Sequence, residues 1–293
     1  MAAIEALSLR GDARVRRRRL VNRLMEALAT LAALLAVAVL GIVVYSVAIR
    51  GADELSWSFL TSDLPIFGEP GGGIAPLILG SAILVGLAAA MALPIGVLTA
   101  LFITEFASNW VARAIQLVLD LMNGLPSIVI GIFAYGLLVV GHVQKGYAGA
   151  LALAIIMLPL IARSTQEVLR LVPRSQREGA LALGVSRWRT VLGIVLPGAL
   201  GGVVTGTVLA IARAAGETAP LLFTTSIFTN NVSTDVRHAL PNIPVQIFIW
   251  SESSDPQDHK RAWAAGFVLL AFVLLTSLVA RAALARSRRK LNR

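Results

Sequence analysis

Residues 74–103 read IAPLILGSAILVGLAAAMALPIGVLTALFI, thirty residues without a charged side chain. A helix needs about 20 apolar residues to cross the hydrocarbon core of a bilayer, so this block predicts a membrane span. Backbone polar groups in lipid must bond to one another, which favours a helix. A transmembrane barrel needs segments of about ten residues that alternate in polarity, and the sequence has none.

Five further apolar blocks have the same character. They cover residues 24–49, 114–140, 147–161, 198–225 and 262–284, and 147–161 is the shortest. The composition agrees, because 57% of the 293 residues are hydrophobic and 14% are charged. Soluble domains have about 25% charged residues. We therefore predict an all-α polytopic membrane protein with six transmembrane helices, and we exclude a soluble globular protein.

Basic residues gather on alternate segments between these blocks. Twenty of the 26 Lys and Arg residues lie in one set of segments and five in the other. The basic set is 1–23, 104–113, 163–193 and 281–293, and the other set is 50–73, 141–146 and 226–261. Cytoplasmic segments carry such an excess, so we expect both termini in the cytoplasm and the protein in the cell inner (plasma) membrane. The basic excess then faces membrane lipid, and we expect no nucleic acid partner.

The blocks and their connections predict one transmembrane domain. The predicted divisions are a basic cytoplasmic segment at 1–23, the transmembrane domain at 24–285 and a basic cytoplasmic tail at 286–293. Within the domain, 163–197 is a long inner connection and 226–261 a long outer one. An apolar run at 245–250 suggests that the outer connection is partly ordered. The chain has no cysteine and only three histidines, far apart, so we expect no metal site and no cofactor.

The inner connection contains a helix–turn–helix pattern. Residues 180–183, ALAL, favour a helix. Gly184 is placed to end it, because glycine adopts the left-handed conformation at low cost. Ser186 is a suitable N-cap for a second helix. From these residues alone, an amphipathic hairpin at the membrane interface is an equally good interpretation.

A family resemblance separates these interpretations. The pattern formed by Glu178, Gly179, Ala180, Gly184, Leu196 and Pro197 resembles the EAA loop of ABC importer permeases. That loop reads E-A-A, three residues, G, about nine residues and I-x-L-P, and Gly179 replaces its usual first alanine. In the family this loop is the coupling helix, which fits a groove of the cytoplasmic ATPase. The resemblance implies the type I (MetI-like) ABC importer permease architecture.

Three more segments are similar to the PstA phosphate permeases within this family. They are GGIAPLILGS at 72–81, NGLPSIVIG at 123–131 and ARAAGETAPLL at 212–222. The resemblance implies a permease subunit of an ATP-driven importer of inorganic phosphate, with no ATPase site of its own. It also implies a PstC-like permease as heterodimer partner, two PstB-like ATPase subunits and a PstS-like extracytoplasmic phosphate-binding protein.

The block at 198–225 holds the most informative polar residues. Gly198, Gly202 and Gly206 recur every four residues, a spacing that lets a second helix approach closely. Arg213 and Glu217 fall within the arc of this stripe, so we expect Arg213 to face protein rather than lipid. A charged side chain inside a membrane helix is costly. Either the two residues form a self-neutralising ion pair, or Arg213 lies on the anion path and Glu217 holds it.

Other polar residues are weaker candidates for the path. Thr218 and Ser127 carry hydroxyls suited to line it, although such hydroxyls often bond their own backbone. Asp120 is a possible second partner for Arg213, or an ordinary interfacial residue. Pro220 lacks a backbone donor, so it is expected to kink the fifth helix.

Three alternative functions stay open at this point. A permease for sulfate or molybdate would share the architecture. A secondary transporter would use Glu217 or Asp120 for protons and is expected to show internal repeats and broken helices in both halves, which are not visible in the sequence. A polytopic membrane enzyme needs a nucleophile or an acid–base cluster near one membrane face, and the positions of the His, Asp and Glu residues suggest none. The sequence also lacks the phosphate-binding loop G-x-x-x-x-G-K-[ST], so ATP hydrolysis requires a separate subunit.

Overall fold

The computed structural model describes residues 13–65, 71–141, 143–226 and 234–291, and all its regular elements are helices. Parts of three predicted segments lie outside these residues. They are 1–12 of the basic N-terminal segment, 292–293 of the basic tail and 227–233 of the outer connection. The chain forms two compact units, Met1–Ile49 and Arg50–Arg293.

The first unit is represented by one helix. Helix α1 (Ala13–Ala52) is continuous over 40 residues and ends just inside the second unit. It contains the predicted block 24–49, and its stretch Val15–Ala52 is a candidate membrane span by length and by the hydropathy of its apolar window.

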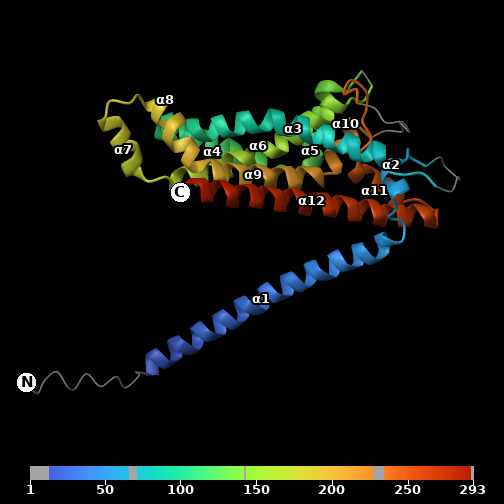
Figure 1. Cartoon of the computed structure of the whole chain (residues 1–293), viewed down its shortest axis with the longest axis horizontal. Helices are drawn as coiled ribbons and strands as arrows, with labels where there is room; N and C mark the ends of the chain where they lie inside the picture. Colours follow the sequence, from blue (N-terminus) through green and yellow to red (C-terminus); the bar gives the residue numbers. More distant parts are fainter. Residues whose placement is uncertain (1–12, 66–70, 142, 227–233, 292–293) are drawn as a thin grey trace, which may run out of the picture. The chain divides into compact units, whose positions relative to one another are not determined.

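The second unit is built around α6 (Gly146–Leu171). Helices α3 (Ala75–Leu101) and α9 (Leu196–Ala215) pack along α6, and α12 (Pro256–Leu291) packs along α9 (Figure 1). Small side chains such as Ala88, Ala150 and Ala210 fill the core between these helices and allow their close packing. Of the apolar window of α6, 67% is buried, the largest share among the spanning helices.

Within the predicted inner connection 163–197, long helices extend further in from both sides than the apolar blocks indicate. Helix α6 continues ten residues beyond the predicted block 147–161, to Leu171. A second helical run, Arg187–Ala215, joins α8 (Arg187–Thr190), the π-helix η2 (Val191–Val195) and α9. A helix enclosed by protein does not need an apolar surface, and Thr165 and Gln166 are buried within α6. Polar residues in this segment therefore do not mark the end of the helix.

The third block, 114–140, is not one straight helix as predicted. It forms α4 (Asn109–Gly124) and α5 (Ser127–Leu138), which are bent by 100° against each other. Pro126 lacks an N–H group and disfavours helical backbone at the preceding residue. Leu125 is accordingly extended, with φ −69° and ψ 135°. The described residues thus contain five long spanning helices, or six if the bent pair counts as one.

The fifth block, 198–225, is also broken, and the expected kink at Pro220 is wrong. Helix α9 ends at Ala215, and a short helix α10 (Ala219–Thr224) follows. Pro220 lies at the start of α10, where its missing donor is not needed. A Cβ atom built on Gly131 of α5 would lie 2.6 Å from Cα of Pro220, so the backbones of α5 and α10 meet there.

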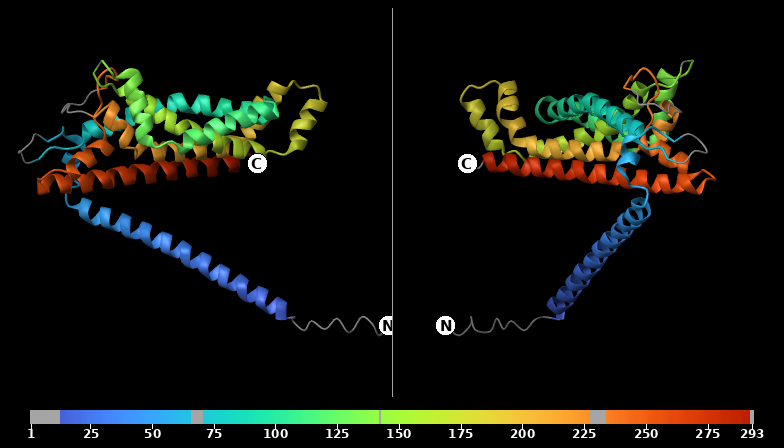
Figure 2. Two further views of the ribbon diagram at one scale, coloured as in Figure 1. Left: turned by 180° about the vertical axis from the view of Figure 1, so that it is seen from behind. Right: turned by 45° about the vertical axis from the view of Figure 1, so that its right-hand side comes forward.

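The two ends of the second unit differ in their elements. One end, which we call the basic end, carries α7 (Arg174–Ala182) and α8, whereas α2 (Trp57–Thr61), α10 and α11 (Ile243–Ser251) lie at the opposite end (Figure 2). Helix α11 falls within the predicted outer connection. Asn242 caps it by accepting a bond from Val245 N–H, and Trp250 is buried against α12. Helix α11 is therefore packed into the unit.

Candidate functional site

The basic end carries the helix–turn–helix that the sequence predicts. Helix α7 ends at Ala182, and Gly184 adopts a φ of +79°, which side chains with a Cβ rarely adopt. The N–H groups of Gly184 and Val185 donate to carbonyls of the last turn of α7, at 3.0 and 3.1 Å. Helix α8 begins after Ser186. The turn therefore depends on a conformation that glycine supplies.

The tip of this hairpin exposes apolar side chains. Leu183 is 86% exposed and Trp188 is 55% exposed, while Leu181 is 48% exposed. Glu178 and Gly179 are also exposed, whereas Ala180 is buried and anchors α7 to the unit. An exposed apolar cluster with a polar rim is typical of a protein–protein contact.

A largely buried ion pair between Arg177 and Glu105 connects α7 to the spanning helices. Arg177 donates from Nε and Nη2 to one oxygen of Glu105, at 3.1 and 2.9 Å. The side chain of Glu105 is 9% exposed and that of Arg177 is 20% exposed. Glu105 belongs to the π-helix η1 (Phe102–Phe106), which continues α3. The pair therefore joins the hairpin of α7 and α8 to the end of a spanning helix.

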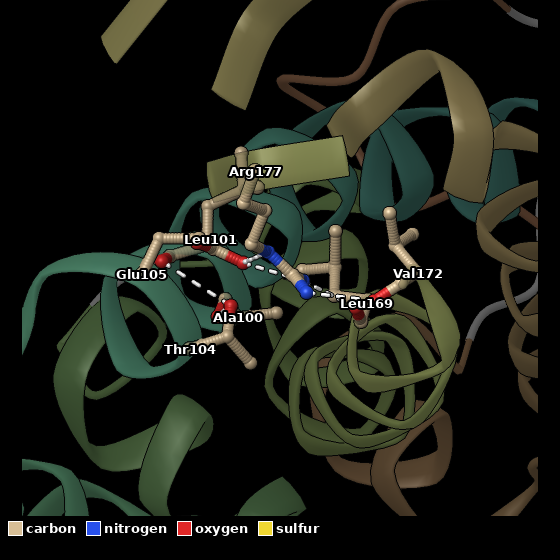
Figure 3. A network of polar contacts seen from close by, with 7 residues as sticks. All are labelled: Ala100, Leu101, Thr104, Glu105, Leu169, Val172 and Arg177. Atoms are coloured by element: carbon tan, nitrogen blue, oxygen red, sulfur yellow. Dashed lines mark hydrogen bonds and ion pairs between the residues drawn. The ribbon is translucent and has the colours of Figure 1, made fainter. Parts of the chain in front are cut away.

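The guanidinium group of Arg177 also caps the C-terminal end of α6. Arg177 donates to the carbonyl oxygens of Val172 and Leu169, each at 2.7 Å (Figure 3). These carbonyls belong to the last turn of α6, where backbone acceptors have no partner within the helix. One side chain of α7 thus holds α6 and η1 together. No local sequence pattern connects the two residues of this pair, because they lie 72 residues apart.

The glycine stripe of α9 lies against α6. Cβ atoms built on Gly202 and Gly206 would overlap the side chains of Val168 and Ser164, and one on Gly198 would contact Val172 at 3.8 Å. The first two glycines therefore set how closely α6 and α9 approach.

Arg213 and Glu217 lie at the break between α9 and α10. Arg213 Nε and Glu217 Oε1 are 3.6 Å apart. The Arg213 side chain is 56% exposed, whereas that of Glu217 is 16% exposed. Within this chain Arg213 does not lie on the buried stripe of α9, because Ala214 occupies the buried face and Arg213 is rotated out of it. Arg213 is presented on the surface of the chain.

The remaining candidate path residues, Asp120, Ser127 and Thr218, lie in two separate regions of the second unit. Asp120 forms an ion pair with Arg163 of α6 and not with Arg213, so the suggested Asp120–Arg213 pairing is wrong. Ser127 is the first residue of α5, and Thr218 directly precedes α10. The contact between Gly131 and Pro220 therefore brings the helices that begin at these two hydroxyl residues side by side.

Comparison with known proteins identifies the family. The profile of the family described as "Binding-protein-dependent transport system inner membrane component" matches residues 92–293. The chain belongs to this family. The matched region begins within α3 and includes α7, the Arg177–Glu105 pair and the Arg213–Glu217 pair.

Curated relatives resemble the permease over most of its length. The Phosphate transport system permease protein PstA of Yersinia pestis is 36% identical over 248 residues, 84% of each chain. That of Pasteurella multocida is 35% identical, over 90% of this chain and 94% of its own. That of Haemophilus influenzae is 34% identical, over 89% and 92%.

Solved structures confirm the predicted fold class. A chain of the bacterial alginate ABC transporter superimposes with a TM-score of 0.64 at 14% identity, covering 91% of this chain and 96% of that chain. A chain of the inward-facing MetNI methionine ABC transporter gives a TM-score of 0.57 at 16% identity, covering 73% and 94%. The permease therefore has the all-α fold of ABC transporter permeases.

Proposed function

We propose that the permease is the membrane subunit of an ATP-driven importer of inorganic phosphate. The observation that carries this proposal is the match to PstA phosphate permeases, which extends over 84% or more of this chain in the relatives described above. The fold is consistent with this function.

The hairpin of α7 and α8 is the proposed coupling element to a separate ATPase. Its exposed leucines and tryptophan suit a groove on a protein partner, and the chain contains no phosphate-binding loop of its own. Glu178, Gly179, Ala180, Gly184, Leu196 and Pro197 form the proposed coupling motif. The complete importer would contain two PstB-like ATPases, a PstC-like permease and a PstS-like phosphate-binding protein.

The proposed phosphate path runs past Arg213, Glu217, Thr218 and Ser127. Because Arg213 is exposed on this chain, a second permease packed against it would enclose the guanidinium between the two subunits. A fixed positive charge in such a water-poor interior stabilises a passing anion more strongly than it would in water. This arrangement agrees with a path at the interface of a heterodimer.

Uptake measurements test the proposed substrate. Cells that lack their own phosphate permease would receive this permease together with its three partner subunits. We expect uptake of radiolabelled phosphate that requires both the permease and an ATPase able to hydrolyse ATP. Uptake of sulfate or molybdate instead would replace the proposed substrate, and phosphate uptake without the ATPase would indicate a secondary transporter.

The proposed orientation has a separate test that uses the absence of native cysteine. Ser175 of α7 and Ser251 of α11 are both exposed and lie at opposite ends of the second unit. We expect Ser251→Cys to react with a membrane-impermeant maleimide added to spheroplasts, and Ser175→Cys to react only after the membrane is opened. The reverse labelling pattern would show that α7 faces outward and would contradict coupling to a cytoplasmic ATPase.

A further inference from the structure

A large polar cavity opens at the basic end, outside the proposed phosphate path. Its volume is about 1110 Å³. The charged residues that line it are Glu105, Arg113, Arg170, Arg174, Arg177 and Glu178. They come from η1, α4, α6 and α7, and none belongs to α9 or α10. We call this space the arginine cavity.

The charges around the arginine cavity are not balanced. Four arginines and two glutamates line it, a net charge of +2. Glu105 is engaged by Arg177, and Glu178 makes no ion pair with a described residue. Within the described part of the chain, Arg170 and Arg174 also make no ion pair or hydrogen bond through their side chains. Among the described residues, Arg113 donates only to the carbonyl oxygen of Asn109, at 3.1 Å.

Two helices also begin at the arginine cavity. Asn109 is the first residue of α4, and Arg174 is the first residue of α7. Neither helix has a side-chain hydrogen bond at its N-cap, which is Ser108 in α4 and Pro173 in α7. First-turn N–H groups have no acceptor within their own helix, and the helix dipole makes this end positive. Both features add to the positive field of the guanidinium groups.

This combination matches the chemistry of a phosphate group. A guanidinium presents its N–H donors as a rigid fork that binds two phosphate oxygens at once. Uncapped helix N-termini provide further donors to an anion. Carboxylates are outnumbered at this cavity, so an anion bound there would reduce the repulsion among the arginines.

We propose that the arginine cavity binds a phosphate-bearing anion through Arg113, Arg170 and Arg174. The bound group would connect α4, α6 and α7, three elements that meet at this cavity. It would thereby fix the position of the proposed coupling helix relative to the spanning helices. Two sources share this chemistry: free inorganic phosphate, and the head group of an anionic phospholipid. The proposal does not depend on which ion the permease transports.

The test compares two charge-matched double variants of the full chain. Arg170→Gln/Arg174→Gln removes two positive charges from the arginine cavity. Arg187→Gln/Arg189→Gln removes two from exposed residues of α8 at the same end, outside the cavity. In the first arm, each protein in phosphatidylcholine nanodiscs is titrated with radiolabelled inorganic phosphate. In the second arm, native mass spectrometry counts phosphatidylglycerol retained by each protein against phosphatidylcholine.

We expect the cavity variant to bind one of these ligands about tenfold more weakly or worse, because hydrogen bonds to charged groups are lost. The α8 variant is expected to bind both ligands like the wild type. A loss confined to phosphate identifies a free anion, and one confined to phosphatidylglycerol identifies a lipid. A second phosphate site near Arg213 would contribute equally to all three proteins. Thermal melting in the same nanodiscs separates loss of binding from loss of fold.

Two outcomes would overturn the proposal. The first is equal binding of both ligands by the wild type and both variants. The second is unchanged binding of both ligands while the cavity variant alone no longer co-purifies with the ATPase. That result would assign Arg170 and Arg174 to docking of a protein partner.

Discussion

Replacing Arg213 and Glu217 together by glutamine is expected to lower phosphate uptake at least about tenfold, the effect of about 1.4 kcal/mol on a barrier. The single variant Arg213→Gln is not informative, because it leaves the largely buried Glu217 carboxylate without its partner. The double variant removes both charges and keeps both side chains polar. An anion in the interface then loses its nearest fixed positive charge, while the fold keeps no unpaired ion.

A second ion pair provides the matched control. Asp120 of α4 and Arg163 of α6 form a pair that is remote in sequence from the break between α9 and α10. Asp120→Asn/Arg163→Gln is expected to retain most uptake, because exposed ion pairs contribute little to stability. Both double variants are checked for assembly by co-purification with the ATPase. Near-normal uptake by assembled Arg213→Gln/Glu217→Gln would exclude this pair from the transport step.

Replacing Arg177 by methionine is expected to destabilise the permease by about 3 kcal/mol, the usual cost of removing one partner of a buried ion pair. Glu105 would remain buried without a counter-charge, and the carbonyls of Leu169 and Val172 would each lose a donor. Methionine keeps an apolar chain of similar length, so loss of packing is small. The measurements are thermal melting of the purified chain and co-purification with the ATPase.

Arg189→Met is the control for this prediction. Arg189 lies on α8 at the same end of the unit and is exposed, with its guanidinium over the ring of Trp188 at 5.3 Å. Its replacement is expected to change stability by about 0.5 kcal/mol or less. Adding Glu105→Gln to Arg177→Met removes the unpaired charge and is expected to restore part of the lost stability. Equal effects of Arg177→Met and Arg189→Met would contradict a specific structural role for the Arg177–Glu105 pair.

Apolar blocks predicted the spanning helices but not where they break. The uncharged block 74–103 became α3 and the first two residues of η1. Proline alone does not mark a break: Pro94 and Pro159 lie inside the continuous helices α3 and α6, whereas Pro126 accompanies a 100° bend. What differs is the surrounding packing, which a single sequence does not display.

Local sequence spacing likewise predicts some contacts at the candidate site and not others. Arg213 and Glu217 are four residues apart, so helical spacing alone suggests their pairing. Arg177 with Glu105 and Arg163 with Asp120 join different helices, 72 and 43 residues apart, and no local pattern connects them. The glycine spacing also does not indicate the exposure of Arg213, because a stripe repeated every four residues drifts around a helix with 3.6 residues per turn.

The backbone contact between Gly131 and Pro220 limits how segments can be exchanged between relatives. A chimera that took residues 126–138 from another permease would place a foreign α5 surface against the native α10. Any side chain larger than hydrogen at position 131 would meet the backbone at Pro220, 2.6 Å from its Cβ atom. Residues 126–138 and 216–224 therefore form one transplantable module, and a graft that transfers only one of them requires compensating changes in the other.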